Sequence, residues 1–276
     1  MQYKILVVLY NKKITESETC LSILLCRNLI LNKCEVLIWD NSNSFNEDER
    51  TLFENELERV AISFWGDGNN YPLSYIYNFV IKKVDNKGLL VIFDHDSLIS
   101  SGYFEELFTL DCLYPDVNLF LPQIYYRNQL VSPAKLYYFI GRYFSKTVYG
   151  KYSAKYLTAI NSGMAIRLEY LKEIFPGYNS RILFYGTDND FMYKYSLANK
   201  FVFIMNAKIE HTLNYYEEKD LTLKFARYKD MKHGALVQMK DINRFLFWFC
   251  CFYYLCYEIK MSIKHRTLHL FKVVYH

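Results

Sequence analysis

The stretch Leu89-Leu90-Val91-Ile92-Phe93-Asp94-His95-Asp96-Ser97 decides the fold. Its first five residues are all apolar, which is typical of a strand buried on both faces of a sheet. The run then ends in two carboxylates that flank a histidine. Acids at the carboxyl end of a buried parallel strand lie where open α/β sheets bind ligands, and two acids one residue apart can share a divalent cation. An acidic, helix-capping turn gives the same pattern, so the interpretation depends on the rest of the chain.

Strands and helices alternate on the N-terminal side of this stretch. We expect strands over 4–9, 34–39, 60–65 and 89–93, and helices over 18–31, 48–58 and 73–83. This alternation predicts βαβ units and a mostly parallel sheet. Polar loops follow three of the strands, with Asp40 in the first, Asp67 and Asn70 in the second, and Asp94 and Asp96 in the third. Because parallel strands end at the same sheet edge, we expect these side chains to converge there.

The pattern on the C-terminal side is less regular. We expect helices over 102–110 and 169–175, a short strand over 119–121, and a strand over 157–167 that is broken near Gly163. A further helix should begin at Gly186-Thr187, with Asp188 and Asp190 in its first turn, and short strands over 201–205 and 207–210 lead into His211. The Tyr- and Phe-rich segment 137–156 has no clear pattern, and both a loop over the site and a packing segment fit it.

Composition limits the classes of protein that fit. The 276 residues are 52% hydrophobic, enough for one large folded domain with an appendage, and the net charge of +4 is too small to predict nucleic-acid binding. Aromatic residues reach 18%, a composition that suits flat amphipathic partners such as sugars. The seven cysteines form no C-x-x-C pair, which is typical of reduced thiols. With no signal-peptide pattern at the start, we expect a cytoplasmic protein.

The tail differs from the rest. We divide the chain into a domain over 1–215 and a helical region over 216–276. Residues 245–257 are almost purely apolar and aromatic, and Lys260, Lys264, His265 and Arg266 follow them. Thirteen such residues are too few to span a bilayer, for which about 20 are needed. They suit either an interfacial helix resting on a membrane surface, which we favour, or a buried helix that closes the fold.

Six short motifs follow one another between residues 3 and 215. They are Val7-Val8-Leu9-Tyr10-Asn11, Ile38-Trp39-Asp40-Asn41-Ser42, an N-x-P-x-x-x-x-x-N pattern from Asn70 to Asn78, Asp94-His95-Asp96, Asn161-Ser162-Gly163-Met164-Ala165-Ile166-Arg167, and Gly186-Thr187-Asp188-Asn189-Asp190-Phe191, with His211 after them. In this order they resemble the family-2 inverting glycosyltransferases of the GT-A fold, above all the rhamnosyltransferase-like enzymes of bacterial surface polysaccharide (O-antigen) synthesis. Three positions depart from the family pattern: Leu9 replaces Thr, Pro72 replaces Gly, and Thr187 replaces an acid.

The resemblance implies a site and a reaction. A hexosyl or deoxyhexosyl group would move from a UDP- or dTDP-sugar to a hydroxyl of an oligosaccharide acceptor that is polyprenyl-linked, with Asp188 as general base and inversion at the anomeric carbon. Asp96 and His211, with Asp94, would hold Mn²⁺ or Mg²⁺. The donor nucleotide would lie against Asn11, Asp40, Asp67, Asn70, Asn78 and Asp94, and the acceptor side would include Ser162, Gly163 and Asp190.

Each of these residues also has a structural interpretation. Two acids in the first turn of a helix stabilise it, turn residues such as Asp40 and Asp67 are common, and a histidine after a strand is more often packed than metal-bound. A nucleotidyltransferase on a similar sheet is a weaker alternative, because Asn11-Lys12-Lys13 after the first strand contains no glycine. A non-catalytic carbohydrate- or partner-binding module on a degenerate fold is the main alternative, since it would tolerate the three departures.

Overall fold

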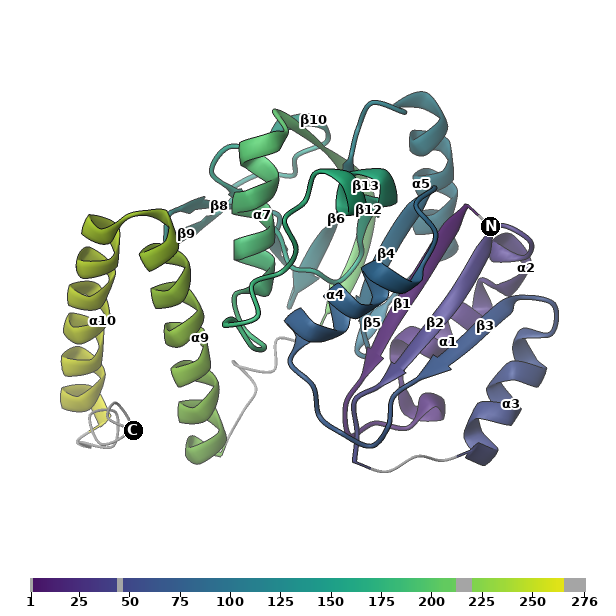
Figure 1. The fold of residues 1–276 in the computed structure, drawn as a ribbon, viewed down its shortest axis with the longest axis horizontal. Coiled ribbons are helices and arrows are strands. Elements are labelled where there is room, and N and C mark those ends of the chain that lie inside the picture. The colour runs from purple at the N-terminus through teal and green to yellow at the C-terminus, as the bar shows by residue number, and fades with distance from the viewer. Residues whose placement is uncertain (1, 44–46, 212–219, 266–276) are drawn as a thin grey trace.

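The computed structural model describes residues 2–43, 47–211 and 220–265 (Figure 1). The strands are β1 (Tyr3–Leu9), β2 (Cys34–Asp40), β3 (Ala61–Trp65), β4 (Leu89–Asp94), β5 (Ser97–Leu98), β6 (Leu119–Tyr126), β7 (Gln129–Ser132), β8 (Ala134–Tyr137), β9 (Ile140–Tyr143), β10 (Gly150–Ser153), β11 (Leu157–Thr158), β12 (Met164–Arg167) and β13 (Phe201–His211). The helices are α1 (Glu18–Leu25), α2 (Arg27–Ile30), α3 (Glu47–Leu57), α4 (Leu73–Lys83), α5 (Ser101–Leu113), α6 (Leu168–Glu173), α7 (Thr187–Ala198), α9 (Leu221–Ile242) and α10 (Arg244–His265), with one 3₁₀ turn at Ile14–Glu16.

One large mixed sheet forms the centre of the molecule. Its order is β10-β13-β6-β12-β4-β1-β2-β3, with β5 on β13 and β7 on β6. The four strands β4, β1, β2 and β3 are mutually parallel, as the alternation of strands and helices predicts. β12 runs antiparallel between β4 and β6. A second, three-stranded sheet of β11, β8 and β9 lies beside the large one.

Helices cover both faces of the sheet, which explains the unbroken apolar run in β4. Leu89, Val91 and Phe93 belong to the core on the face of α1, α2, α3 and α5. Leu90 and Ile92 belong to the core on the opposite face, with α4, α6 and α7. Because successive side chains of a strand point to opposite faces, a strand covered on both sides must be apolar at every position.

Several elements differ from the expected ones. The helix expected over 18–31 is two helices, because the chain leaves helical geometry at Cys26. β6 continues to Tyr126 beyond Pro122, and the two short strands expected over 201–210 are the single strand β13, whose register shifts between Ile204 and Lys208. The segment 137–156, for which no structure was assigned, contains β9, β10 and the end of β8.

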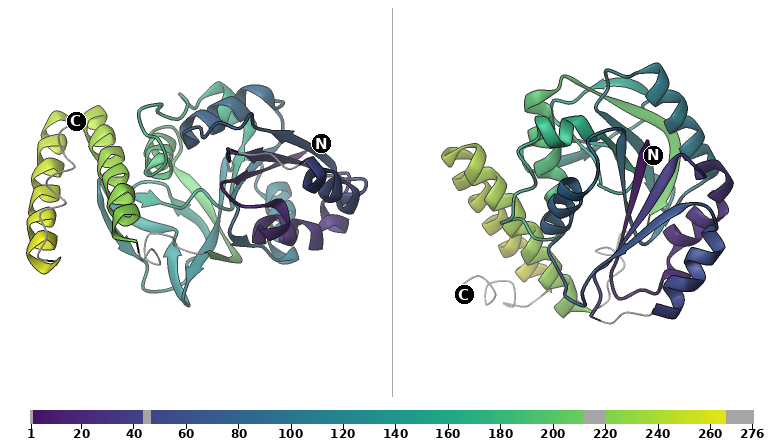
Figure 2. Two further views of the ribbon diagram at one scale, coloured as in Figure 1. Left: turned by 90° about the horizontal axis from the view of Figure 1, so that it is seen from below. Right: turned by 45° about the vertical axis from the view of Figure 1, so that its right-hand side comes forward.

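The C-terminal helices α9 and α10 form an antiparallel pair to one side of the sheet (Figures 1 and 2). α9 packs against the segment that leads into α7: a Cβ added at Gly234 would lie 2.4 Å from the backbone carbonyl oxygen of Tyr185. α10 packs mainly on α9, with which it makes far more contacts than with the sheet. Over the described ranges, no helix has the length and apolar character needed to cross a bilayer.

Candidate active site

The end of β4 is held in place by three hydroxyl groups. The backbone N–H of Asp94 donates to Oγ of Ser162 at 3.1 Å, and Oγ of Thr19 donates to the backbone carbonyl of Asp94. The hydroxyls of Ser97 and Ser162 lie 2.6 Å apart. Ser162 is fully buried, so it acts on the site through its hydrogen bonds with the backbone of Asp94 and with Ser97. Both carboxylates, Asp94 and Asp96, are partly exposed at this edge of the sheet.

Topology brings His211 to the same turn. β5 begins directly after Asp96, and its Ser97 pairs with His211, the last residue of β13. The side chain of His211 lies outside the described residues. Among the side chains that the structure describes, no group of three His, Cys, Asp or Glu is close enough to hold a metal ion. The turn nevertheless fits a divalent cation in its donors, because it presents two carboxylates and the strand that pairs with it ends in a histidine.

Asp188 lies in the first turn of α7, and Gly186, with a φ of +94°, is the N-cap of that helix. Burial desolvates the carboxyl group and raises its pKa to about 6, hydrogen bonds from the backbone of Asn189 and of Asp188 itself oppose this, and the negative charge of Asp94 raises it further. The interaction with Asp94 shows that the fold brings together the end of β4 and the start of α7, which are separated by more than ninety residues. A carboxyl group with a pKa of about 6 can act as a base near neutral pH.

A buried polar group from α4 completes this region. The side chain of Tyr77 is fully buried, and burial, followed by the charge of Asp94 and interactions with Tyr178 and Asp188, raises its pKa. Its ring packs against that of Tyr178, with the centroids 4.9 Å apart. Asn161 reaches the start of α7, where its Nδ2 donates to Oγ1 of Thr187 at 3.1 Å. The threonine that departs from the family motif is therefore part of the packing around Asp188.

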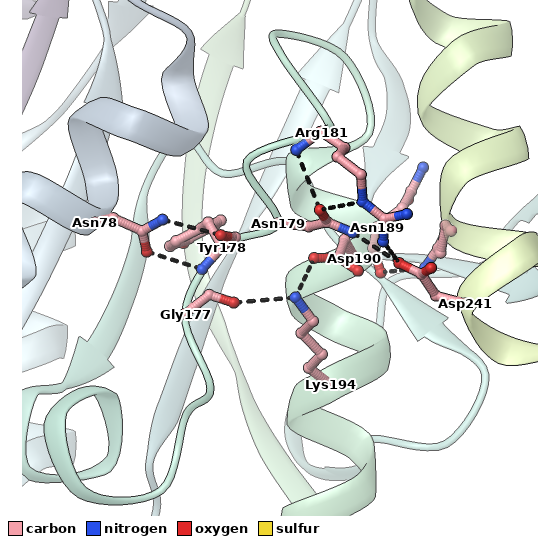
Figure 3. A network of polar contacts seen from close by, with 10 residues as sticks. Asn78, Gly177, Tyr178, Asn179, Arg181, Asn189, Asp190, Lys194 and Asp241 are labelled. Atoms are coloured by element: carbon pink, nitrogen blue, oxygen red, sulfur yellow. Dashed lines mark hydrogen bonds and ion pairs between the residues drawn. The ribbon is translucent and has the colours of Figure 1, made fainter.

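Asp190 has a different partner from Asp188. It forms a buried ion pair with Lys194, 2.7 Å apart, and Lys194 also donates to the backbone carbonyl of Gly177 (Figure 3). Burial raises the pKa of Asp190, while the hydrogen bond and charge of Lys194 lower it. Asp190 therefore helps, through Lys194, to hold α7 against the segment that precedes it.

Asn78 belongs to the same network (Figure 3). Its Oδ1 accepts from the backbone N–H of Tyr178 and its Nδ2 donates to the backbone carbonyl of Tyr178, both at 2.9 Å. The amide of Asn78 thus holds the chain that leads to α7. Gly163 is also enclosed: a Cβ there would lie 2.6 Å from side-chain atoms of both Ile209 and Pro122.

The other predicted donor residues lie in loops at the ends of β1, β2 and β3. Oδ1 of Asp40 accepts from the backbone N–H of Ser42, whose hydroxyl accepts from the backbone N–H of Asn11. Oδ2 of Asp67 accepts from the hydroxyl of Tyr71 at 2.8 Å, and this bond lowers the pKa of Asp67. Asn70 accepts from Nδ2 of Asn41, 2.7 Å away.

Two features of this edge were not among the predicted site residues. Asn41 is buried and also binds both backbone groups of Tyr71, so it ties the end of β2 to the loop before α4. Around it lies an aromatic cluster formed by Trp39, Trp65, Tyr71, Tyr75 and Phe79. Within it, the rings of Tyr71 and Tyr75 stack with centroids 4.5 Å apart. The four-residue spacing of Tyr71, Tyr75 and Phe79 is the sequence signal that reveals it.

Solved structures resemble this chain in fold. The crystal structure of GalNAc-T7 with UDP, GalNAc and Mn²⁺ matches with a TM-score of 0.58 and 12% identity over 76% of this chain and 44% of that one. Residues 1–349 of TarS from S. aureus match with a TM-score of 0.55 and 14% identity over 87% of this chain and 65% of that one. The mannosyltransferase PcManGT from Pyrobaculum calidifontis, in complex with GDP-Man and Mn²⁺, matches with a TM-score of 0.58 and 11% identity over 87% of this chain and 64% of that one.

These likenesses confirm the fold expected from the sequence, an α/β fold of the GT-A type with a helical C-terminal part. The chain spans less than two thirds of the length of each of the three matched chains. No protein-family model matches the sequence. A search of curated proteins finds no match either.

Proposed function

We propose that this chain is an inverting glycosyltransferase that moves a sugar from a nucleotide-diphosphate donor to a hydroxyl group of an acceptor. One observation carries the proposal: Asp188, with a pKa raised to about 6, interacts with Asp94 at the diacidic end of β4. A base and a diphosphate-holding group must lie close together for this reaction. An ordinary helix-stabilising acid would be solvated and would keep its usual pKa.

In this proposal Asp188 accepts the proton of the acceptor hydroxyl as its oxygen attacks the anomeric carbon. The bond from that carbon to the diphosphate breaks on the opposite face, so the configuration inverts. Asp96 and His211 would hold Mn²⁺ or Mg²⁺, with Asp94 on the ribose or a metal-bound water. A divalent cation bound there offsets the negative charge of the leaving diphosphate. Tyr77 interacts with the charge of Asp188, and Asn161 binds Thr187, the residue before it in the first turn of α7.

The donor would lie along the ends of β1, β2 and β3. The carboxylates of Asp40 and Asp67 and the amides of Asn11 and Asn70 supply hydrogen-bonding groups there, and the stacked rings of Tyr71 and Tyr75 supply a flat apolar surface beside them. GalNAc-T7 was solved with UDP, TarS with UDP-GlcNAc and PcManGT with GDP-Man, which supports a nucleotide-sugar donor in general. We retain UDP- and dTDP-sugars, and hexosyl or deoxyhexosyl transfer, as the first donors and reactions to test.

The acceptor assignment rests on the motif resemblance. We propose a polyprenyl-linked oligosaccharide of surface polysaccharide or O-antigen synthesis, used at the cytoplasmic face of a membrane by a rhamnosyltransferase-like enzyme. All seven cysteines are free, which suits a reducing compartment. Ser162 and Gly163 are too enclosed to contact an acceptor directly, so we assign them to the support of Asp94. Asp190 acts through Lys194 and α7.

The test is release of nucleoside diphosphate from a panel of UDP-, dTDP- and GDP-sugars, with Mn²⁺ or Mg²⁺ and with soluble oligosaccharide acceptors. Asp96→Ala should abolish metal-dependent release. Asp116→Ala is the matched control, because Asp116 is exposed, precedes β6 at the opposite edge of the sheet, and pairs with Lys151. Tight donor binding without turnover, unchanged in Asp188→Asn, would instead identify the non-catalytic binding module.

A further inference from the structure

The helix α10 has one face packed and one face open. Its packed face lies on α9: the ring of Tyr257 stacks on that of Tyr228 with centroids 5.6 Å apart, and Glu258 forms a buried ion pair with Lys232 at 2.7 Å. Cys250 is buried on the same side. Glu258 is the only acid in the sequence of α10, and its negative charge is paired with Lys232 on the packed face.

The opposite face of α10 is apolar and exposed. Its exposed large side chains recur at helical spacing along the whole helix: Phe245, Trp248, Phe249, Phe252, Tyr253, Leu255, Ile259 and Ile263. Arg244 and Lys260 are exposed with them, and no acid lies on this face. The sequence of residues 245–257 is almost purely apolar, and the structure divides this helix into a packed face and an open face. We call the open face, with Arg244 and Lys260, the outward face.

An exposed aromatic hairpin continues this surface. Phe139, in the turn between β8 and β9, packs against Phe249 and Tyr253 at the edge of the outward face, with ring centroids 5.8 and 5.3 Å away. Beside Phe139, Tyr138 and Ile140 are exposed. The surface therefore extends over two elements that lie side by side in Figure 1.

We propose that the outward face of α10 and the β8–β9 turn together dock on the surface of an anionic membrane. Aromatic rings favour the depth of the lipid headgroups, aliphatic side chains are buried at the acyl boundary, and Lys and Arg attract anionic lipids. Contiguous exposed apolar patches on a folded protein usually mark a site that binds another protein or a membrane.

Charge favours a membrane over a second copy of the chain. The outward face carries only positive charge, so two copies paired through it would bring cations together with no acid between them. Anionic headgroups neutralise the same cations. Further basic residues, Lys264, His265 and Arg266, follow Lys260 in the sequence, and their side chains lie outside the described part.

A membrane-docked α10 would be connected to the candidate active site through α9, on which it packs. Asp230 of α9 accepts from the backbone N–H of Tyr185 at 2.9 Å, and Gln238 donates to the backbone carbonyl of Asn189 at 3.1 Å. Both contacts lie on the segment that carries Asp188. The docking proposal itself needs no catalytic activity, so it stands or falls separately from the proposed function.

The test uses the full chain with vesicles of phosphatidylcholine, with and without phosphatidylglycerol. We expect the chain to float with the anionic vesicles and its tryptophan emission to shift to the blue. Trp248 is the source of that shift, since it is 62% exposed whereas Trp39 is buried and Trp65 partly buried. The double variant Trp248→Gln/Phe252→Gln should bind at least about tenfold more weakly.

Two further variants separate charge and folding from apolar contact. Lys260→Glu should weaken binding to anionic vesicles by about tenfold, and because it changes one exposed charge it keeps the test valid if the double variant fails to fold. Leu197→Gln removes an apolar side chain of α7 that is 71% exposed and should bind like the parent. Failure of the parent to float, or equal flotation of the double variant, would overturn the proposal. A dimer that the double variant dissociates, with no flotation, would show an interface between copies instead.

Discussion

Asp188 on α7 is desolvated by burial and lies within range of the negative charge of Asp94 at the end of β4, and both effects raise its pKa, to about 6. The two residues come from opposite sides of the chain's midpoint, and the sheet and α7 bring them together. A carboxylate in this setting is unstable as an anion at neutral pH compared with one in water. It is therefore ready to accept a proton from a hydroxyl that approaches it.

The first prediction concerns the pH dependence of transfer. If Asp188 is the base, kcat/KM should rise about tenfold per pH unit on the acid side and level off above about pH 6, where Asp188 is ionised. The measurement is a pH series of nucleoside diphosphate release at low donor concentration. A rate that is flat between pH 5 and 7 would show that Asp188 does not titrate in the reaction.

The second prediction concerns stability. Because the pKa of Asp188 in the folded protein lies above its ordinary value, the protonated carboxyl stabilises the fold at low pH, and this contribution is lost as the pH rises through about 6. Asp188→Asn removes the charge, so we expect it to raise the free energy of unfolding by roughly 1–3 kcal/mol at pH 7.5 without metal. Denaturant unfolding at pH 7.5 and at pH 4.5 measures it, and the gain should largely vanish at the lower pH.

Asp190→Asn is the matched control for that experiment. Asp190 lies in the same first turn of α7 as Asp188, but it is buried and forms an ion pair with Lys194. The ion pair with Lys194 offsets part of the effect of burial on the pKa of Asp190, which is still raised, so we expect Asp190→Asn to gain less in the free energy of unfolding than Asp188→Asn. A gain in Asp190→Asn as large as that in Asp188→Asn would contradict the distinction between the two acids.

The third prediction concerns the contact of α9 with the segment before α7. In Gly234→Ala the new Cβ would lie 2.4 Å from the carbonyl oxygen of Tyr185, so α9 or the segment has to shift. We expect the free energy of unfolding to fall by about 1–3 kcal/mol and kcat to fall about ten- to a hundredfold, with donor affinity unchanged. Thermal unfolding and donor titration separate these effects.

Gly102→Ala serves as its control. Gly102 also lies within a helix, α5, but the nearest atom to its added Cβ is Oγ of Ser100 at 3.6 Å, an ordinary contact. This variant should gain roughly 0.5–1 kcal/mol from helix propensity and keep its activity. Equal behaviour of the two alanine variants would mean that α9 does not position Asp188.

The fourth prediction concerns Asn78. Both ends of its amide are bonded to the backbone of Tyr178, so Asn78→Ala leaves two backbone groups without their partner. We expect a loss of about 1–3 kcal/mol in the free energy of unfolding and a donor Kd close to that of the parent. A donor Kd that rises strongly with no loss of stability would show instead that Asn78 contacts the nucleotide, as the motif resemblance implies.

Much of the fold could be predicted from the sequence because its parallel half obeys local rules. Strands β1 to β4 are apolar runs bounded by polar loops, and Ser17, a residue type that favours helix N-caps, caps α1 by accepting from the backbone N–H of Cys20. The strands β8 to β10 escaped prediction because most of their residues are partly or fully exposed and mix Tyr with Lys or Arg, so no alternation of apolar and polar residues marks them. β8 and β10 pair with strands that follow later in the chain, β11 and β13, whereas β9 pairs with the adjacent β8.

The candidate site divides in the same way. The order of motifs predicts one site for Asp94 and Asp188, and that assignment stays a prediction; in the fold the charge of Asp94 acts on Asp188. Asp190 and Lys194 are four residues apart, a spacing at which opposite charges pair on a helix, so the sequence does carry a signal for this ion pair. It carries none for the binding of Tyr178 by Asn78, which depends on how α4 packs against the segment before α7. The division of the chain at residue 215 stays a prediction, and the contacts of Asp230, Gly234 and Gln238 with the segment before and within α7 show that α9 is joined closely to the larger part.

The most direct test of the central claim compares Asp188→Asn with the parent chain in two measurements on one donor: the donor Kd in the presence of Mn²⁺, and the rate of sugar transfer to an acceptor. We predict that the donor Kd of Asp188→Asn stays within a few-fold of the parent value, because the variant keeps the donor groups at the ends of β1 to β4. Its transfer rate should be lower by about 10²–10⁴-fold, because it loses the general base. Transfer by Asp188→Asn at the parent rate would contradict it.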